Sequence, residues 1–252
     1  MHNGTDIIYS YDGTFDGLLC CVFKCYEKKE MPCGIHSPEN DQLTLCEVRE
    51  IITDTHKADR VKKSLKEKVY PRTYYDIELC FLSCSPDKDL VIVKFIIMSF
   101  KFGAAVYSML ADNTVNALFT ISKNVSREAH YYKEFLRFSV YNGVLVSVIE
   151  PKNIVLPLIK HHYADRLNNE SFMIFDRTHQ MALTYSEKRA KIFPVEELEL
   201  PEADEEEIKY RNLWKQFYNT IGIKERYNPK CRMNLMPKRY WKQLTEYSEL
   251  IK

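Results

Sequence analysis

The dipeptide Asn142-Gly143 constrains the fold of this chain more than any other feature. It stands between two apolar-rich runs, 136–141 and 144–148. Asn and Gly both accept the positive φ angles that a two-residue hairpin turn requires, and short apolar runs on either side are typical of its strands. The sequence therefore predicts a β-hairpin at this point.

The hairpin opens a region in which further strands are expected. A helix is predicted at 154–167, and apolar runs near 172–176, 181–185 and 191–195 have the length and composition of strands. We expect these segments to build an antiparallel sheet region spanning residues 136–200.

The residues before the hairpin have a different texture. A short strand is predicted at 7–11, a turn at 12–17, and then a helix with an apolar stripe that begins at Phe15. A strand around 44–51 is followed by helices up to about residue 135, the first of them capped by Thr53 or Asp54. This pattern predicts a mainly helical N-terminal region, residues 1–135, that starts with a strand-turn-helix unit.

These regions together predict an α+β protein. A mainly helical N-terminal region packs beside an antiparallel sheet, and residues 201–252 add an acidic connector and a basic, aromatic helical segment. The three regions can also form one integrated domain. With 252 residues and 45% hydrophobic content, the chain can bury one large core or two modest ones.

Composition also bounds the cellular setting. The first residues lack the basic and apolar regions of a secretory signal, and the apolar run 90–110 is interrupted by Lys94 and Lys101. We therefore expect a cytoplasmic protein without a membrane partner. The eight cysteines have no zinc-ribbon or cluster-binding spacing, so they are interpreted as reduced thiols, mostly buried.

Charge is segregated toward the C-terminus. Between Lys209 and Lys242 ten Lys or Arg residues face one acid, Glu225, and seven aromatic residues lie among them. Cations neutralise phosphates and aromatic rings stack on bases, so this segment predicts a nucleic-acid-binding surface. The residues expected to bind are Arg211, Lys215, Lys224, Arg226, Lys230, Arg232, Lys238, Arg239, Tyr240 and Trp241.

An alternative explains the aromatic residues without a ligand. Tyr210, Trp214, Phe217 and Ile221 recur at helical spacing, and a helix normally buries such a stripe. In that case the cations form a solvated face, and Trp241 belongs to a core.

Two other groups could carry chemistry. The turn residues Asp12, Gly13, Thr14, Asp16 and Gly17 could present backbone amides to an anion, although their carboxylates favour a capping role. A catalytic alternative rests on His130, His162 and Asp176 with nearby arginines, and we expect these side chains to converge near the hairpin. Spacing supplies at most two metal ligands and no common cofactor motif occurs, so neither metal nor cofactor is predicted.

Several of these segments resemble a known family. Residues 11–19, Arg137-Phe138, His162-Tyr163, Asp176-Arg177 and the closing motif 228–241 are similar to the bacterial family named probable DNA metabolism protein. The resemblance implies a role in DNA repair or modification, beside a uracil-DNA glycosylase-like protein and a radical SAM protein. It transfers no catalytic residue, and we expect any glycosylase activity to come from another protein.

The leading hypothesis is therefore a DNA-binding accessory factor. Two alternatives stay open: an enzyme that acts on nucleic acid through the His/Asp/Arg group, and a protein-interaction module whose basic segment docks an acidic partner.

Overall fold

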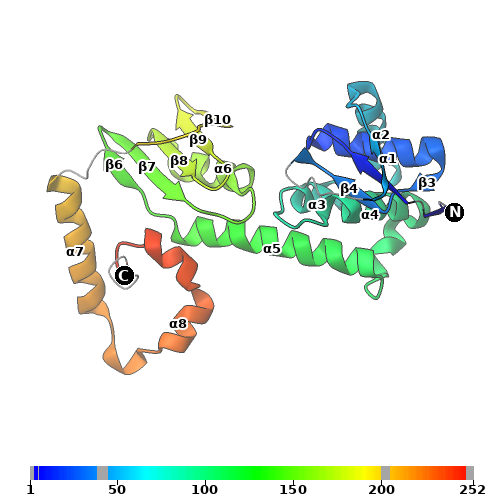
Figure 1. The fold of residues 1–252 in the computed structure, drawn as a ribbon. Coiled ribbons are helices and arrows are strands. Elements are labelled where there is room, and N and C mark those ends of the chain that lie inside the picture. The colour runs from blue at the N-terminus through cyan, green and yellow to red at the C-terminus, as the bar shows by residue number, and fades with distance from the viewer. Residues whose placement is uncertain (1–2, 5, 39–44, 200–204, 248–252) are drawn as a thin grey trace. The chain divides into compact units, whose positions relative to one another are not determined.

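A computed structural model describes residues 3–4, 6–38, 45–199 and 205–247. The chain divides into two compact units, Met1–Val125 (unit 1) and Ser126–Lys252 (unit 2), and the long helix α5 (Asn113–Phe135) contains the boundary (Figure 1). Both helices and sheets are present, which confirms the predicted α+β class.

Unit 1 combines helices with a small parallel sheet. Strand β2 (Ile7–Ser10) lies between β4 (Gly34–His36) and β5 (Glu47–Glu50) and runs parallel to both, with Ile8 opposite Gly34 and Val48. Strands β1 (Asn3–Gly4) and β3 (Glu30–Met31) form a separate parallel pair. The predicted strands at 7–11 and 44–51 are confirmed, whereas their parallel pairing was not predicted.

Helices form the rest of unit 1. Helix α1 (Phe15–Lys28) confirms the predicted strand-turn-helix unit. Asp54 caps α2 (Thr55–Lys68), because its carboxylate accepts hydrogen bonds from the backbone amides of His56 and Lys57. They are followed by α3 (Arg72–Phe81), α4 (Lys88–Phe102), the 3₁₀ helix η2 (Gly103–Ser108) and the first part of α5.

The turn before α1 is held by its own side chains. Thr14 accepts a hydrogen bond from the Gly17 amide at 3.0 Å, and Asp12 accepts from the Thr14 amide at 3.0 Å and hydroxyl at 2.7 Å. A Cβ on Gly17 would lie 2.3 Å from the Asp12 carboxylate, so only glycine fits there. Asp16 pairs with Lys62 at 2.7 Å. Thr14 therefore caps α1 and Asp12 stabilises the turn, which is the role that the sequence favoured over anion binding.

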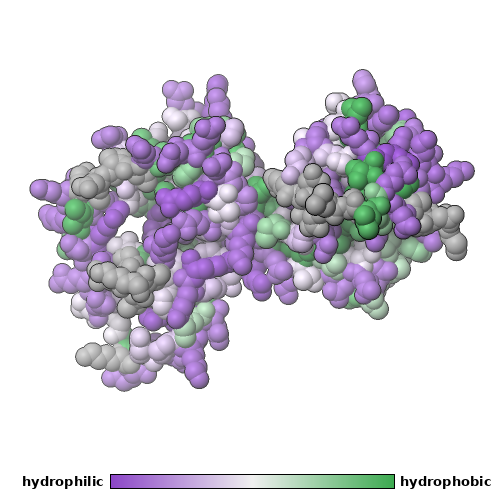
Figure 2. Space-filling model, in the orientation of Figure 1, coloured by the Kyte–Doolittle hydropathy of each residue, from purple (hydrophilic) through white to green (hydrophobic). Residues whose placement is uncertain are grey.

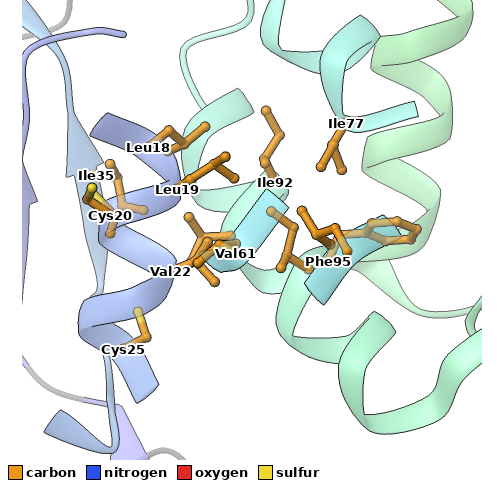
Figure 3. Close-up of a cluster of buried hydrophobic side chains, with 14 of the residues drawn as sticks. Leu18, Leu19, Cys20, Val22, Cys25, Ile35, Val61, Ile77, Ile92 and Phe95 are labelled. Atoms are coloured by element: carbon orange, nitrogen blue, oxygen red, sulfur yellow. The ribbon is translucent and has the colours of Figure 1, made fainter. Parts of the chain in front are cut away.

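The core of unit 1 lies between α1, α2 and α4. Leu18, Leu19 and Val22 of α1 face Ile92 and Phe95 of α4, all at 0% exposure (Figure 3). The segment 88–108 is long and apolar enough to cross a membrane by length and composition, the one such helix among the described residues. The burial of α4 in this core is an alternative reason for its apolar sequence.

The cysteines are free in this structure. All eight are described, none forms a disulfide, and four are buried in unit 1, namely Cys20, Cys21, Cys25 and Cys80. Burial, with the Glu30 carboxylate nearby, raises the pKa of Cys25 to about 12, so this thiol stays protonated and behaves as a small apolar group.

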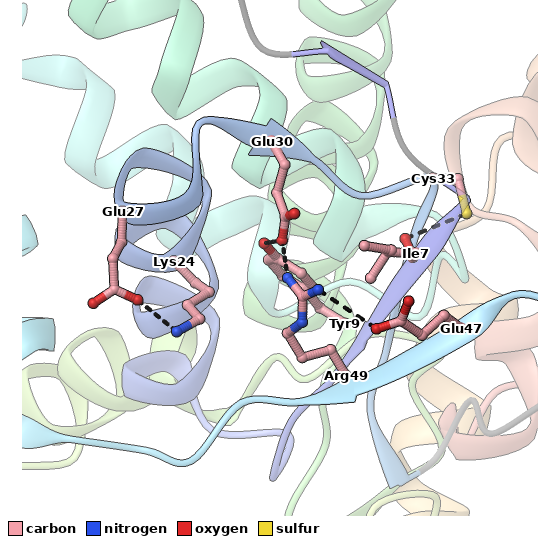
Figure 4. Close-up of polar contacts among 8 residues, drawn as sticks. All are labelled: Ile7, Tyr9, Lys24, Glu27, Glu30, Cys33, Glu47 and Arg49. Atoms are coloured by element: carbon pink, nitrogen blue, oxygen red, sulfur yellow. Dashed lines mark hydrogen bonds and ion pairs between the residues drawn. The ribbon is translucent and has the colours of Figure 1, made fainter.

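Beside the small sheet a polar cluster joins β2, β3 and β5. The Tyr9 hydroxyl donates to Glu30 at 2.6 Å, and Arg49 pairs with Glu30 and with Glu47 (Figure 4). These contacts pair the Glu30 carboxylate of β3 with a cationic and a hydroxyl donor. They link β3, which belongs to one sheet, to β2 and β5 of the other sheet.

Unit 2 is built on a five-stranded sheet with the order β10-β9-β8-β7-β6. The predicted hairpin is confirmed: β6 (Ser139–Tyr141) and β7 (Val144–Ile149) are antiparallel, and Asn142 and Gly143 have φ angles of 49° and 78°. The other strands are β8 (Phe172–Asp176), β9 (Met181–Ser186) and β10 (Arg189–Pro194).

One strand pair corrects the expectation of an antiparallel sheet. β7 and β8 are parallel, with Ser147 opposite Ile174, whereas the other three pairs are antiparallel. The reason is the helix α6 (Leu156–Arg166) between them, because a crossover helix returns the chain to the end at which the first strand began. Ile159 and Tyr163 of α6 are buried in the core over one face of the sheet.

One long helix and three short ones complete unit 2. They are α7 (Glu205–Ile221), η3 (Lys224–Arg226), α8 (Pro229–Leu235) and η4 (Lys238–Gln243). Tyr240 enters the sheet core, and Trp241 forms a second cluster with Leu244 and Tyr247. The visible surface of the protein is mainly hydrophilic (Figure 2).

Candidate nucleic-acid interface

Unit 2 contains a pocket of about 350 Å³, here called the sheet pocket. This volume lies in the range of small-molecule sites. Its floor is the hairpin, its walls are α7 and the segment around η4, and the end of β7 and the residue after β8 close one side. The lining residues are Arg137, Ser139, Tyr141, Val146, Ser147, Val148, Glu150, Arg177, Arg211, Lys215, Lys242, Gln243, Leu244 and Thr245.

Strand alternation explains why this floor is open to a ligand. Leu145 and Ile149 of β7 pack into the core with α6, so Val146 and Val148 point to the opposite face. Ser139 is opposite Val146 in the hairpin ladder and therefore lies on the same face. One face of the sheet carries the core and the other carries the pocket.

Polar contacts connect α7 to the edge strand β6. The Val140 amide donates to Glu207 at 3.3 Å, and Arg211 donates to the Ser139 hydroxyl at 2.7 Å while pairing with Glu207 at 2.8 Å. An edge strand exposes unpaired amides, and Glu207 satisfies one of them. The same contacts bring Arg211 and Lys215, one helical turn apart, to the pocket wall.

The pocket is cationic, and its charges are only partly compensated. Arg137 pairs with Glu246 at 3.5 Å and Arg211 with Glu207, but Arg177 and Lys242 share one carboxylate, that of Glu150, each at 3.0 Å. The hydrogen bond from Lys242 and the two cationic charges hold the pKa of Glu150 below its ordinary value. Among these groups four cations face three carboxylates, an excess of one positive charge located at Arg177 and Lys242.

The predicted binding cations divide into three groups. Arg211 and Lys215 line the pocket; Lys242, which was not among the residues expected to bind, also lines it. Arg226, Lys230 and Lys238 are exposed elsewhere in unit 2, and the side chain of Lys224 lies outside the described part of the chain. Arg232 and Arg239 have structural partners.

Arg232 and Arg239 both hold the C-terminal segment together. The Arg232 guanidinium lies over three rings, those of Tyr227, Trp241 and Tyr247, at 4.9–5.5 Å. Arg239 pairs with the buried carboxylate of Glu128 at 3.2 Å. Both cations are engaged within the protein, so their first role is in packing.

The structure corrects the roles expected of two aromatic residues. Tyr240 is 1% exposed and Trp241 is 5% exposed, and the Trp241 indole donates to the Met236 carbonyl at 2.9 Å. Neither ring face is accessible to a base. The sequence-based assignment of Tyr240 and Trp241 to base stacking is therefore wrong for this conformation, because both side chains are needed to cover the core.

The stripe on α7 shows the opposite outcome. The alternative interpretation of the sequence buried Tyr210, Trp214, Phe217 and Ile221. Their exposed fractions range from 41% to 61%, and α7 has no buried residue, so the structure contradicts that alternative. The Trp214 indole donates to Glu246 at 3.0 Å, and Glu246 also pairs with Arg137 of the pocket. Trp214 does not line the pocket, but it shares Glu246 with the lining residue Arg137, and its side chain is 41% exposed.

The catalytic candidates have separate local partners. His130 is exposed and pairs with Glu134 at 3.1 Å, and Asp176 is fully buried and accepts from the Thr178 and His179 amides and from the His179 ring. His162 packs edge-on against Tyr163, and its Nε2 is buried without a hydrogen-bond partner. Within the described chain the three share no partner, and no group of three metal ligands occurs.

Sequence reasoning missed the part that the hairpin plays. Arg137 and Arg177 were noted as neighbours of the histidines and as part of the family resemblance, but not as binding residues, and Ser139 and Glu150 were not considered as site residues. The alternation of faces along the hairpin strands could have indicated that Ser139 and Val146 share a face. The pairing of Glu150 with Lys242, 92 residues away, had no local signal.

Comparison with known proteins places the chain in a family. No curated protein matches it. A family profile described as a domain of unknown function, DUF4130, matches residues 86–246, more than half of the chain and every residue that lines the sheet pocket, and the chain therefore belongs to this family.

Proposed function

We propose that this protein is a nucleic-acid-binding accessory factor in DNA repair or modification. Its sheet pocket receives the phosphate of a single-stranded or unstacked nucleotide. The observation that carries the proposal is the shared carboxylate: Arg177 and Lys242 both pair with Glu150, so a positive charge is left for an anionic ligand.

The chemistry of the pocket supports a phosphate ligand. Arg offers a planar fork of donors and Lys a compact charge, and both side chains are more than half exposed here. The Ser139 hydroxyl and the apolar floor at Val146 and Val148 add a polar contact and a surface for a sugar or a base. An incoming phosphate would take over the position of the Glu150 carboxylate between the two cations.

The exposed rings of α7 support a base-stacking role beside the pocket. Trp214 and Phe217 lie with their ring centres 5.8 Å apart, and Trp214 adjoins the pocket through Glu246. Stacking on aromatic rings is sequence-tolerant and typical of single-strand binding. Phosphate capture and stacking by neighbouring groups suit a nucleotide outside a duplex.

The resemblance to the probable DNA metabolism proteins supports the biological setting. We infer that the protein acts in the cytoplasm and presents DNA to a partner enzyme, either a uracil-DNA glycosylase-like protein or a radical SAM protein. Copurification of the tagged protein from its own host tests these partners, and recovery of neither enzyme would count against this part of the proposal.

The binding proposal is tested by fluorescence anisotropy with a labelled single-stranded oligonucleotide across a salt series. Replacing Arg177 and Lys242 by Gln removes two pocket cations, and the slope of log K against log salt should flatten by up to about 1.4 if both contact phosphate. The matched control replaces Arg226 and Lys230, which are exposed and line no described pocket. Equal effects of both pairs would exclude the pocket as the site, and a wild-type protein without affinity at about 50 mM salt would reject DNA binding.

A further inference from the structure

Unit 1 contains a second pocket, of about 390 Å³, between α1, α2 and α4. We call it the three-helix pocket. Val22 and Val61 form a buried floor, and the rings of Phe23, Tyr26 and Phe100 form the walls. An apolar pocket of this size with a few polar groups is the usual form of a small-molecule site.

The mouth of this pocket is cationic. Arg60 and Lys68 of α2 line it, eight residues apart and so about 12 Å apart along the helix, with Ser64 between them. The Arg60 guanidinium lies 5.2 Å from the centre of the Phe23 ring, which places its charge over the apolar wall. No carboxylate is among the described lining residues.

Three of the other cations of α2 differ from these two, and the fourth, Lys66, lies over the Tyr74 ring at 5.0 Å. Lys57 pairs with Asp54, Lys62 with Asp16 and Asp59, and Lys63 with Glu67. Among the described residues Arg60 and Lys68 have no ion pair within 4 Å. Of the three α2 cations without an ion pair among the described residues, Arg60 and Lys68 line the pocket mouth, where their charge attracts an anion, and Lys66 does not.

We propose that the three-helix pocket binds a small amphipathic anion. The apolar body of the ligand lies between the rings of Phe23, Tyr26 and Phe100, above the buried Val22 and Val61. Its acidic head is held by the Arg60 guanidinium, which can donate two hydrogen bonds to one carboxylate. Lys68 adds attraction from the other end of the pocket. This site is in unit 1 and is independent of the proposed DNA-binding role of unit 2.

Decanoate is the probe, and decanol is the matched uncharged control. Isothermal titration calorimetry of the full chain should show saturable decanoate binding and weaker decanol binding. Arg60→Gln should lower decanoate affinity about tenfold, because a charge-assisted contact is lost, and leave decanol affinity unchanged. Lys63→Gln, on the same helix but 75% exposed and paired with Glu67, should change neither.

Ser64→Phe fills the pocket and should abolish binding of both probes. Arg60 is exposed, so its replacement leaves the core intact and keeps the test decisive even if the Ser64 variant does not fold. The absence of saturable decanoate binding by the wild type would overturn the proposal. So would an Arg60→Gln variant, or a folded Ser64→Phe variant, that binds decanoate as the wild type does.

Discussion

Glu150 should act as an internal competitor of nucleic acid, so its replacement should tighten binding. Its carboxylate lies between Arg177 and Lys242, at 3.0 Å from each, in the place proposed for a phosphate. Glu150→Gln keeps the size of the side chain but removes its charge. Both pairs are exposed, each worth at most about 1 kcal/mol after solvent screening, so the variant should remain folded.

The size of the effect follows from the charges around the pocket. In the ion pairs of the pocket, four cations face three carboxylates, and Glu150→Gln raises the positive excess of these groups from one charge to two. Each additional phosphate that is neutralised steepens the slope of log K against log salt by about 0.7 for single strands. If the variant and the wild type have the same affinity at about 1 M salt, this steeper slope makes the variant bind about eightfold more tightly at about 50 mM salt.

The assay is fluorescence anisotropy with a single-stranded oligonucleotide at several salt concentrations. The control is Glu170→Gln, which removes the same formal charge at an exposed site in unit 2 that lines no described pocket. If Glu150→Gln binds no more tightly than this control, or leaves the salt slope unchanged, then Glu150 does not occupy a phosphate position and the reasoning fails.

Three further predictions concern other parts of the chain. Trp214→Ala should lower single-strand affinity by about 1–3 kcal/mol with little loss of stability. Trp241→Ala should instead cost about 3–5 kcal/mol of unfolding free energy and leave the salt slope of the folded protein unchanged. Anisotropy and thermal melting on both variants separate these effects, and the reverse pattern would refute the assignment. Burial lowers the pKa of His162 below its ordinary value near 6.5, so below that pH the unfolded chain binds more protons than the folded chain and the free energy of unfolding rises with pH up to about that value. His162→Gln should weaken this pH dependence in denaturant melts at pH 5 and above. An unchanged profile would count against the assignment. Thiol titration should recover all eight cysteines after unfolding without reductant. The native protein should react rapidly only at its exposed thiols, which are Cys33, Cys84 and Cys231. Recovery of four or fewer thiols from the unfolded protein would show a misjudged redox state.

Local signals predicted much of the fold. The turn at Asn142-Gly143 needs positive φ at both positions, and few other residue pairs accept it, so the hairpin could be identified from two residues. The cap at Asp54 likewise depends on neighbours within three residues. Such elements are encoded by adjacent residues, which is why sequence reasoning found them.

The site depended on contacts that no local pattern reports. The sheet pocket exists because α7 docks on β6 through Glu207 and Arg211, and because Glu150 meets a lysine from η4. Each contact joins residues more than 60 positions apart. The pocket could therefore not be assembled from spacing, although two of its cations, Arg211 and Lys215, were among the predicted residues.

The two tryptophans illustrate a different limit. Trp214 belongs to a periodic stripe, which is typical of a buried helix face, and yet it is 41% exposed. Trp241 lies in a short 3₁₀ helix without such a pattern, and yet it is buried with Tyr247 and Leu244. Periodicity indicates that a helix has an apolar face, but the tertiary structure or a partner decides what covers it.

The central claim is that nucleic acid occupies the sheet pocket beside α7. The most direct measurement is photocrosslinking of the full-length protein to a single-stranded oligonucleotide that carries 5-bromodeoxyuridine, with the crosslinked peptides identified by mass spectrometry. The account predicts crosslinks within residues 210–217 of α7 and 139–148 of the hairpin, and their loss when Arg177 and Lys242 are replaced by Gln. Crosslinks confined to unit 1, or crosslinks in unit 2 that persist in this double variant, would contradict it.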